Sequence, residues 1–220
     1  SRRQFQGTEA CRLLIPIQSG SSVASWLGPV LAMLDKPDRA TRWSLPGGAA
    51  LGSGERRGKL GFLFPGQGSQ YVGMFGDLAC QFPSVLAALE EANAVFAREH
   101  PENGEQRLSD FVYPPPAFGE ASRRQQEEAL KATEIAQPAI GAVSLGACRA
   151  LTHFGVAAEA TAGHSYGELA ALCGAGRFEA DSLHRLSNVR GRLMACRNGH
   201  SDRGAMLAVQ AGEAAVADLL

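Results

Sequence analysis

The residues best suited to chemistry form one pentapeptide with a serine at its centre: Gly163-His164-Ser165-Tyr166-Gly167. A strand-like run, 156–162, precedes it and a helix-like run, 168–173, follows it. On such a sharp strand-to-helix turn the serine backbone is strained, flanking glycines avoid a clash, and the hydroxyl is pushed into solvent. The start of the helix points free N–H groups at the spot where negative charge develops on an attacked carbonyl. The pattern therefore predicts a nucleophile elbow, with Ser165 as the nucleophile of an acyl transfer.

A second motif lies upstream, where a short apolar run, 59–64, leads into a glycine-rich loop, Pro65-Gly66-Gln67-Gly68-Ser69-Gln70. A phosphate-binding loop would end in Lys followed by Ser or Thr, and both this ending and the spacing are missing. The loop instead offers backbone N–H groups at the carboxyl end of a strand, where α/β sheets place their sites. We expect one of these N–H groups to complete an oxyanion hole.

The two motifs together carry a family resemblance. Residues 62–70 and 163–168 resemble the malonyl-CoA:acyl carrier protein transacylases and the acyltransferase domains of polyketide synthases. The resemblance covers about the last three quarters of the chain and includes 133–139 and 189–194. It implies an α/β-hydrolase-like core with a parallel sheet, followed by a small ferredoxin-like subdomain.

The resemblance also implies roles for individual residues. Ser165 would accept the acyl group, and the backbone N–H groups of Gln67 and Tyr166 would form the oxyanion hole. Gln137 and His164 would line the pocket, and Arg190 would pair with the free carboxylate of a malonyl unit. The implied substrates are malonyl-CoA and a phosphopantetheinylated acyl carrier protein, which react in turn through an acyl-serine without a bound cofactor.

Arg190 is also notable for its position alone. The run 181–197 has a helical pattern, and Arg190 falls on the same stripe as four apolar residues: Leu183, Leu186, Leu193 and Met194. A guanidinium on a buried face is costly unless a partner compensates it, whereas Arg192, about 200° around the helix, is expected on the solvated side. A structural salt bridge or a substrate carboxylate could supply that partner. The nearby elbow and loop favour the carboxylate.

The general base that a serine nucleophile needs is not evident. We expect structural or surface roles for all the histidines: His100, His153, His164, His184 and His200. In the family the base belongs to a histidine motif well after the arginine. The sequence reaches Leu220 without such a motif, so we expect an incomplete acyltransferase whose catalytic histidine lies beyond residue 220.

Composition and charge narrow the class of protein. The chain has 220 residues, of which 45% are hydrophobic and 20% charged, as is usual for a soluble globular protein. A net charge of −1 with scattered arginines gives no reason to expect nucleic acid binding. The longest weakly polar run, 135–148, is too short to span a bilayer, and no signal segment is evident, so we expect a cytoplasmic protein.

The cysteines are odd in number and far apart: Cys11, Cys80, Cys148, Cys173 and Cys196. Their mostly apolar, helix-like surroundings are typical of reduced, buried thiols. No zinc-binding spacing is present, so we expect no metal site.

Three regions follow one another along the chain. Residues 1–58, with a strand at 13–17, a helix at 22–34 and a Gly/Pro/Ser-rich stretch at 35–58, resemble the linker between a ketosynthase and an acyltransferase. Residues 59–202 would form the core, with helices at 77–100 and from about 126 to 153. Residues 203–220 would begin the ferredoxin-like subdomain. The alternation of strands and helices predicts a parallel sheet.

Two other functions stay open. An α/β-hydrolase esterase has the same elbow but discharges its intermediate to water; the glycine-rich loop and Arg190 argue against it. A decayed or truncated scaffold domain of a synthase is compatible with the missing base. Within the acyltransferases, the tyrosine at position 166 makes the elbow resemble that of the iterative synthases of the enediyne and polyunsaturated fatty acid type.

Overall fold

The computed structural model describes residues 10–17, 20, 22–36, 41–54, 58–195 and 212. The chain forms two compact units, Ser1–Gly58 and Lys59–Leu220. The start of the ferredoxin-like subdomain, expected at 203–220, lies outside the described residues except for position 212. None of the helices described here is long and apolar enough to cross a membrane.

In the residues described, the first unit is a small antiparallel sheet with one helix. Its elements are β1 (Cys11–Leu14), α1 (Val23–Leu34), β2 (Arg42–Ser44) and β3 (Ala50–Ser53). The strand order is β1-β3-β2, and the central Leu51 is paired with Leu13 on one side and Trp43 on the other. The sequence reading of 35–58 missed both β2 and β3. These strands are three and four residues long, too short for a clear alternating pattern.

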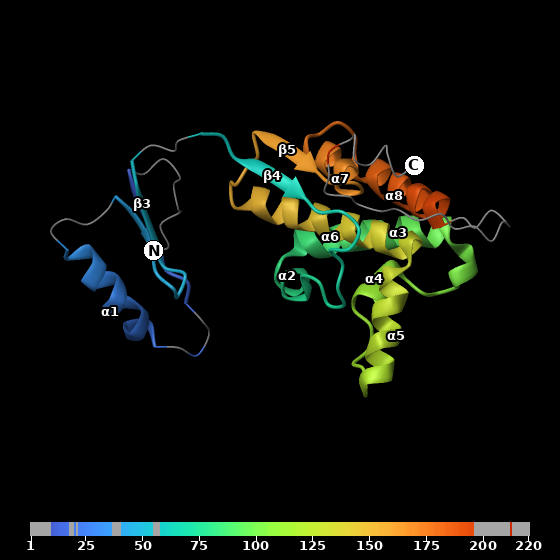
Figure 1. Ribbon diagram of the computed structural model, residues 1–220, viewed down its shortest axis with the longest axis horizontal. Coiled ribbons are helices and arrows are strands. Elements are labelled where there is room, and N and C mark those ends of the chain that lie inside the picture. The colour runs from blue at the N-terminus through green and yellow to red at the C-terminus, as the bar shows by residue number, and fades with distance from the viewer. Residues whose placement is uncertain are drawn as a thin grey trace. The chain divides into compact units, whose positions relative to one another are not determined.

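The second unit carries a parallel strand pair and most of the helices. Its elements in chain order are β4 (Gly61–Phe64), α2 (Gly76–Gln81), α3 (Pro83–Glu99), a 3-10 turn (Pro101–Asn103), α4 (Leu108–Val112), α5 (Glu120–Lys131), α6 (Thr133–His153), β5 (Ala160–Gly163), α7 (Gly167–Gly174) and α8 (Ala180–Ala195). Figure 1 shows β4 and β5 side by side, and their parallel pairing sets Phe64 opposite Gly163. The predicted α/β fold with a parallel sheet is confirmed.

Two helices that the sequence suggested as continuous are interrupted. The expected helix 77–100 breaks at Phe82, whose extended backbone is favoured by the proline at the first position of α3. The expected helix up to His153 breaks at Ala132, between α5 and α6. The strand expected at 156–162 is shorter and begins at Ala160.

Helix α6 lies at the centre of the unit and packs against both α3 and α8 (Figure 1). Small side chains allow this close packing: a Cβ on Gly146 would lie 3.0 Å from the Val85 side chain. The main core cluster joins residues of α3, α4 and α6, among them Leu89, Phe96, Leu108, Ile135 and Ala139. A second cluster, formed by Phe64, Ala170 and Ala171, packs α7 against β4. The strand ends and the start of α7 are thereby held together.

The cysteines correct one expectation from the sequence. Cys11 and Cys80 are exposed, and Cys148 and Cys173 are partly exposed, so these four are free but not buried thiols. Cys196 lies outside the described residues.

Candidate active site

The turn between β5 and α7 forces Ser165 into an unusual backbone conformation. Its φ is +55°, in the left-handed region that residues with a Cβ rarely adopt. A Cβ on Gly163 would lie 2.1 Å from the Gly167 carbonyl, and one on Gly167 would lie 2.2 Å from the Phe64 carbonyl oxygen. Both glycines are therefore required by space, because the elbow folds tightly on itself and against the end of β4.

The glycine-rich loop after β4 lies against this turn. A Cβ on Gly66 would lie 2.5 Å from the His164 carbonyl oxygen and 3.4 Å from the Ser165 Cβ. The loop is held by a hydrogen bond of 2.7 Å from the Gly68 N–H to Gln70 Oε1. Within the described part of the chain, neither the Gln67 nor the Tyr166 backbone N–H has a hydrogen-bond acceptor. These two donors are the ones that the sequence assigned to an oxyanion hole.

Arg190 reaches the elbow from α8. Its Nη2 lies 3.5 Å from Ser165 Oγ, at the outer limit of a hydrogen bond, while its Nη1 donates to Gln137 Oε1 at 2.7 Å. Among the described residues, no carboxylate forms an ion pair with Arg190. The structural salt bridge considered from the sequence is therefore not found in this part of the chain.

Gln137 connects Arg190 to the glycine-rich loop. Its side chain is fully buried on α6, and its Nε2 donates to Gln67 Oε1 at 3.3 Å. Gln67 Nε2 in turn donates to Thr133 Oγ1 at 3.1 Å. Donors and acceptors alternate consistently along this relay, which links the loop, α6 and α8. Sequence reasoning assigned Thr133 no role, although it stands in the same motif as Gln137.

The face of α8 that packs inward differs from the expected one. Its buried residues are Leu183, His184, Ser187, Asn188 and Gly191. Leu186 and Met194 are exposed, and Leu193 is 70% exposed, so the apolar stripe predicted to bury Arg190 is wrong. Small and polar side chains fit here because α8 packs closely on α6: a Cβ on Gly191 would lie 2.9 Å from the Glu134 Cα. Arg190 stands half-buried at the rim of this face.

Arg192, expected toward the solvated side, has a side chain that is 41% exposed and whose guanidinium binds Glu99. Its Nη1 donates to the Glu99 carbonyl oxygen at 2.8 Å, and its Nη2 pairs with the Glu99 carboxylate. The guanidinium thus ties α8 to the end of α3.

The side chain of Tyr166 makes a buried contact with α8. Its side chain is fully buried, and its hydroxyl lies 2.6 Å from Ser187 Oγ. Burial raises the pKa of Tyr166 well above its usual value, so the phenol keeps its proton. The hydroxyl has room because residue 141 is glycine: a Cβ there would lie 2.0 Å from it. A buried phenol requires a polar partner, but the sequence does not reveal which residue supplies it.

The comparison with known protein families decides the family of this chain. The sequence profile described as "Acyl transferase domain" matches residues 61–218. The chain belongs to this acyl transferase family.

Curated relatives of this acyl transferase domain are large synthases. Polyketide synthase GfsE of Streptomyces halstedii is 36% identical over 168 residues, covering 76% of this chain and 4% of that protein. A polyunsaturated fatty acid synthase subunit from a Thraustochytrium species is 29% identical over 205 residues, covering 91% of this chain and 7% of that protein. The chain therefore spans only a small fraction of these relatives.

Solved structures show the same fold. An acyl-carrier-protein-S-malonyltransferase from Bartonella henselae is 34% identical, with a TM-score of 0.51, covering 62% of this chain and 39% of that one. A malonyl-transacylase solved with its type II polyketide synthase acyl-carrier protein is 36% identical, with a TM-score of 0.52 and the same coverage. The acyl transferase domain of ZmaA is 30% identical, with a TM-score of 0.57, covering 67% of this chain and 32% of that one.

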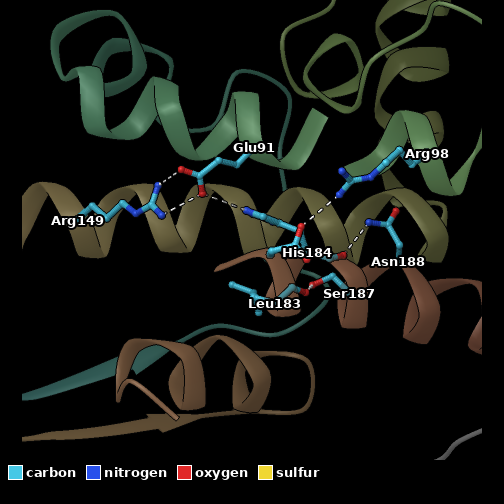
Figure 2. A network of polar contacts seen from close by, with 8 residues as sticks. Glu91, Arg98, Arg149, Leu183, His184, Ser187 and Asn188 are labelled. Atoms are coloured by element: carbon cyan, nitrogen blue, oxygen red, sulfur yellow. Dashed lines mark hydrogen bonds and ion pairs between the residues drawn. The ribbon is translucent and has the colours of Figure 1, made fainter. Parts of the chain in front are cut away.

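In the described part of this acyl transferase domain, the two buried histidines lie between α3 and α8. His184, which the sequence left without an orienting group, is buried and lies 3.9 Å from Glu91, itself bound in a bidentate pair by Arg149 (Figure 2). Its ring nitrogens have no hydrogen-bond partner in the described structure, and burial lowers the pKa of His184 to about 4. His184 is therefore neutral at physiological pH.

His100 is held more firmly. Its Nδ1 lies 3.0 Å from Glu102 Oε1, and its Nε2 lies 3.1 Å from Asn188 Oδ1. Asn188 Nδ2 also donates to the His184 carbonyl oxygen (Figure 2). Asn188 thus joins the two histidines in one network. Both rings serve the packing of α3 on α8. In contrast, His164 is exposed beside Ser165.

Metal ligands are not gathered at the site. Over the described ranges, no group of three or more His, Cys, Asp or Glu side chains could hold a metal ion.

Proposed function

We propose that this domain transfers a malonyl group from malonyl-CoA to Ser165 and then to the phosphopantetheine thiol of an acyl carrier protein. The observation that carries the proposal is the Arg190 guanidinium, 3.5 Å from Ser165 Oγ and held by the neutral amide of Gln137. A cation beside the nucleophile, with no carboxylate partner in the described structure, can pair with an acidic group on the acyl chain. Malonyl is the simplest such acyl group.

Each half of the reaction uses the same groups. Ser165 Oγ attacks the thioester carbonyl of malonyl-CoA, the C–S bond breaks, and coenzyme A leaves with the serine proton. The backbone N–H groups of Gln67 and Tyr166 stabilise the tetrahedral oxyanion. The thiol of the carrier protein then attacks the acyl-serine, and Ser165 regains its proton.

The base that moves this proton is not one of the two buried histidines. His100 and His184 are enclosed between α3 and α8. We propose a histidine outside the described residues as the base. His164, exposed next to Ser165, lines the pocket entrance in this proposal.

The partners follow from the same chemistry. Malonyl-CoA and the carrier protein both present a phosphopantetheine arm, which we propose enters the cleft in turn, without a bound cofactor. A neighbouring ketosynthase, joined through residues 1–58, and a cytoplasmic location complete the proposal. The match to the polyunsaturated fatty acid synthase covers 91% of this chain, which supports an iterative type of synthase.

Intact mass spectrometry of the full-length natural protein tests this function. Incubation with malonyl-CoA is expected to add one malonyl group, which Ser165→Ala abolishes and the control Ser182→Ala, on α8, does not. Addition of the phosphopantetheinylated carrier protein should discharge the adduct onto its thiol. Rapid ester hydrolysis without transfer would indicate an esterase instead, and a complete absence of adduct would indicate a scaffold domain.

A further inference from the structure

The side chain of Tyr166 connects the nucleophile turn to α8, the helix that carries Arg190. We propose that Ser187 is a positioning residue, which holds Arg190 at its place beside Ser165 by accepting a hydrogen bond from Tyr166. Ser187 then contributes to the preference for acyl donors with a free carboxylate. This inference rests on the proposed function, because it assigns the cause of a selectivity at the same site.

The hydrogen bonds have a defined direction. Ser187 Oγ donates to the Leu183 carbonyl oxygen at 2.6 Å, so its single proton is already engaged. The Tyr166 hydroxyl, 2.6 Å away, must therefore be the donor to Ser187 Oγ. Both side chains are fully buried, and water cannot replace either partner. Such a bond in a dry environment fixes the distance between its two elements.

The position of this bond relates it directly to the site. Tyr166 is the residue after Ser165, and Ser187 precedes Arg190 by three positions, about one turn of the same helix. The bond therefore joins the residue next to Ser165 with a residue about one turn before Arg190 on α8. The backbone of α8 near Gly191 is separately set by its close contact with Glu134 on α6.

The contact between Arg190 and Ser165 is sensitive to small shifts of α8. At 3.5 Å, Nη2 is already at the outer limit for a hydrogen bond to Ser165 Oγ. A displacement of about 1 Å can reduce a rate by about 100-fold when reacting groups lose their alignment. A carboxylated donor depends on this alignment at two points, the guanidinium and the nucleophile. A donor without the carboxylate depends on only one.

Selectivity between two donors tests the inference in the full-length natural protein. The loading rate, as kcat/KM, is measured with malonyl-CoA and with acetyl-CoA for Ser187→Ala and Tyr166→Phe. We expect each variant to lose about tenfold with malonyl-CoA and less than about threefold with acetyl-CoA. The matched controls are Ser182→Ala on the same helix and Tyr71→Phe, an exposed tyrosine, which should keep the wild-type preference.

A double variant separates positioning from general stability. Arg190→Ala combined with Ser187→Ala should cost no more with malonyl-CoA than Arg190→Ala alone, because both act through the same guanidinium. Equal losses with both donors, or fully additive losses, would overturn the inference while leaving the proposed function intact. A wild-type protein that loads neither donor would overturn both. If Ser187→Ala does not fold, the donor selectivity of Tyr166→Phe tests the inference, since in that variant Ser187 keeps its bond to the Leu183 carbonyl oxygen.

Discussion

Replacing Gly167 by alanine tests whether the packing of the elbow on β4 places the reacting groups. The added Cβ would lie 2.2 Å from the Phe64 carbonyl oxygen and 2.7 Å from that of Pro65. Both are backbone atoms, which cannot rotate away as a side chain would. Since Cβ atoms essentially never approach within 3.0 Å, β4 and the elbow must separate by about 1 Å, a strain that packed interiors transmit to their neighbours.

Two effects of known size follow from this separation. Overpacking of this kind costs about 1 to 3 kcal/mol, which lowers the melting temperature by about 2 to 12 °C for a domain of this size. The loop that starts at Pro65 moves with β4, so the Gln67 N–H shifts relative to Ser165. We expect acyl-serine formation to slow by about 10- to 100-fold.

The assay combines thermal unfolding by circular dichroism with rapid-quench mass spectrometry of the malonylated protein. Gly76→Ala is the matched control, because its Cβ would meet only the Tyr113 ring at 3.5 Å, an ordinary contact. It should unfold within about 2 °C of the wild type and load at the wild-type rate. Wild-type melting and loading in Gly167→Ala would show that the close approach to Phe64 does not constrain the elbow.

Three further predictions concern single side chains. Arg190→Ala should reduce the preference for malonyl over acetyl donors by about 10- to 150-fold, which corresponds to a charge-assisted pair of about 1.5 to 3 kcal/mol. The control Arg185→Ala, at an exposed position, should keep the wild-type preference. An unchanged preference in Arg190→Ala would refute the role of Arg190 in binding the carboxylate. Thr133→Val should slow loading by about three- to tenfold by freeing the Gln67 amide, with unchanged melting; wild-type loading would contradict the relay. Burial lowers the pKa of His184 from 6.5 to about 4. Between these two pH values the unfolded state therefore binds more protons than the folded state, and the free energy of unfolding should fall by a few kcal/mol as the pH drops from 6.5 to 4. Urea unfolding of His184→Leu should lose most of this slope, and a slope that persists would exclude His184 as its cause.

The elbow could be predicted from the sequence because its constraints are local. Gly163, Ser165 and Gly167 must satisfy the geometry of one turn, and the strand and helix beside it are read from neighbouring residues. The break at Phe82 could also have been anticipated, since a proline follows directly. The break at Ala132 has no such local signal.

The face of α8 could not be predicted, because a helical pattern shows where apolar residues gather but not which face meets a closely packed neighbour. Gly191 and Ser187 pack inward since small side chains let α8 approach α6, while Leu193 stays exposed. Likewise, the pairing of Tyr166 with Ser187 joins residues 21 positions apart. Only the tertiary structure brings them together.

Helix α6 contacts both the turn that carries Ser165 and the side chain of Arg190. Gln137 holds Arg190 by a neutral amide, and Gly141, one turn later on the same helix, makes room for the Tyr166 hydroxyl. An amide oxygen orients the guanidinium without cancelling its charge, whereas a carboxylate in the same place would compete with the acidic group of a substrate. The combination of a buried glutamine and a glycine on α6 thus keeps the cation both fixed and available, which a structural salt bridge would not do.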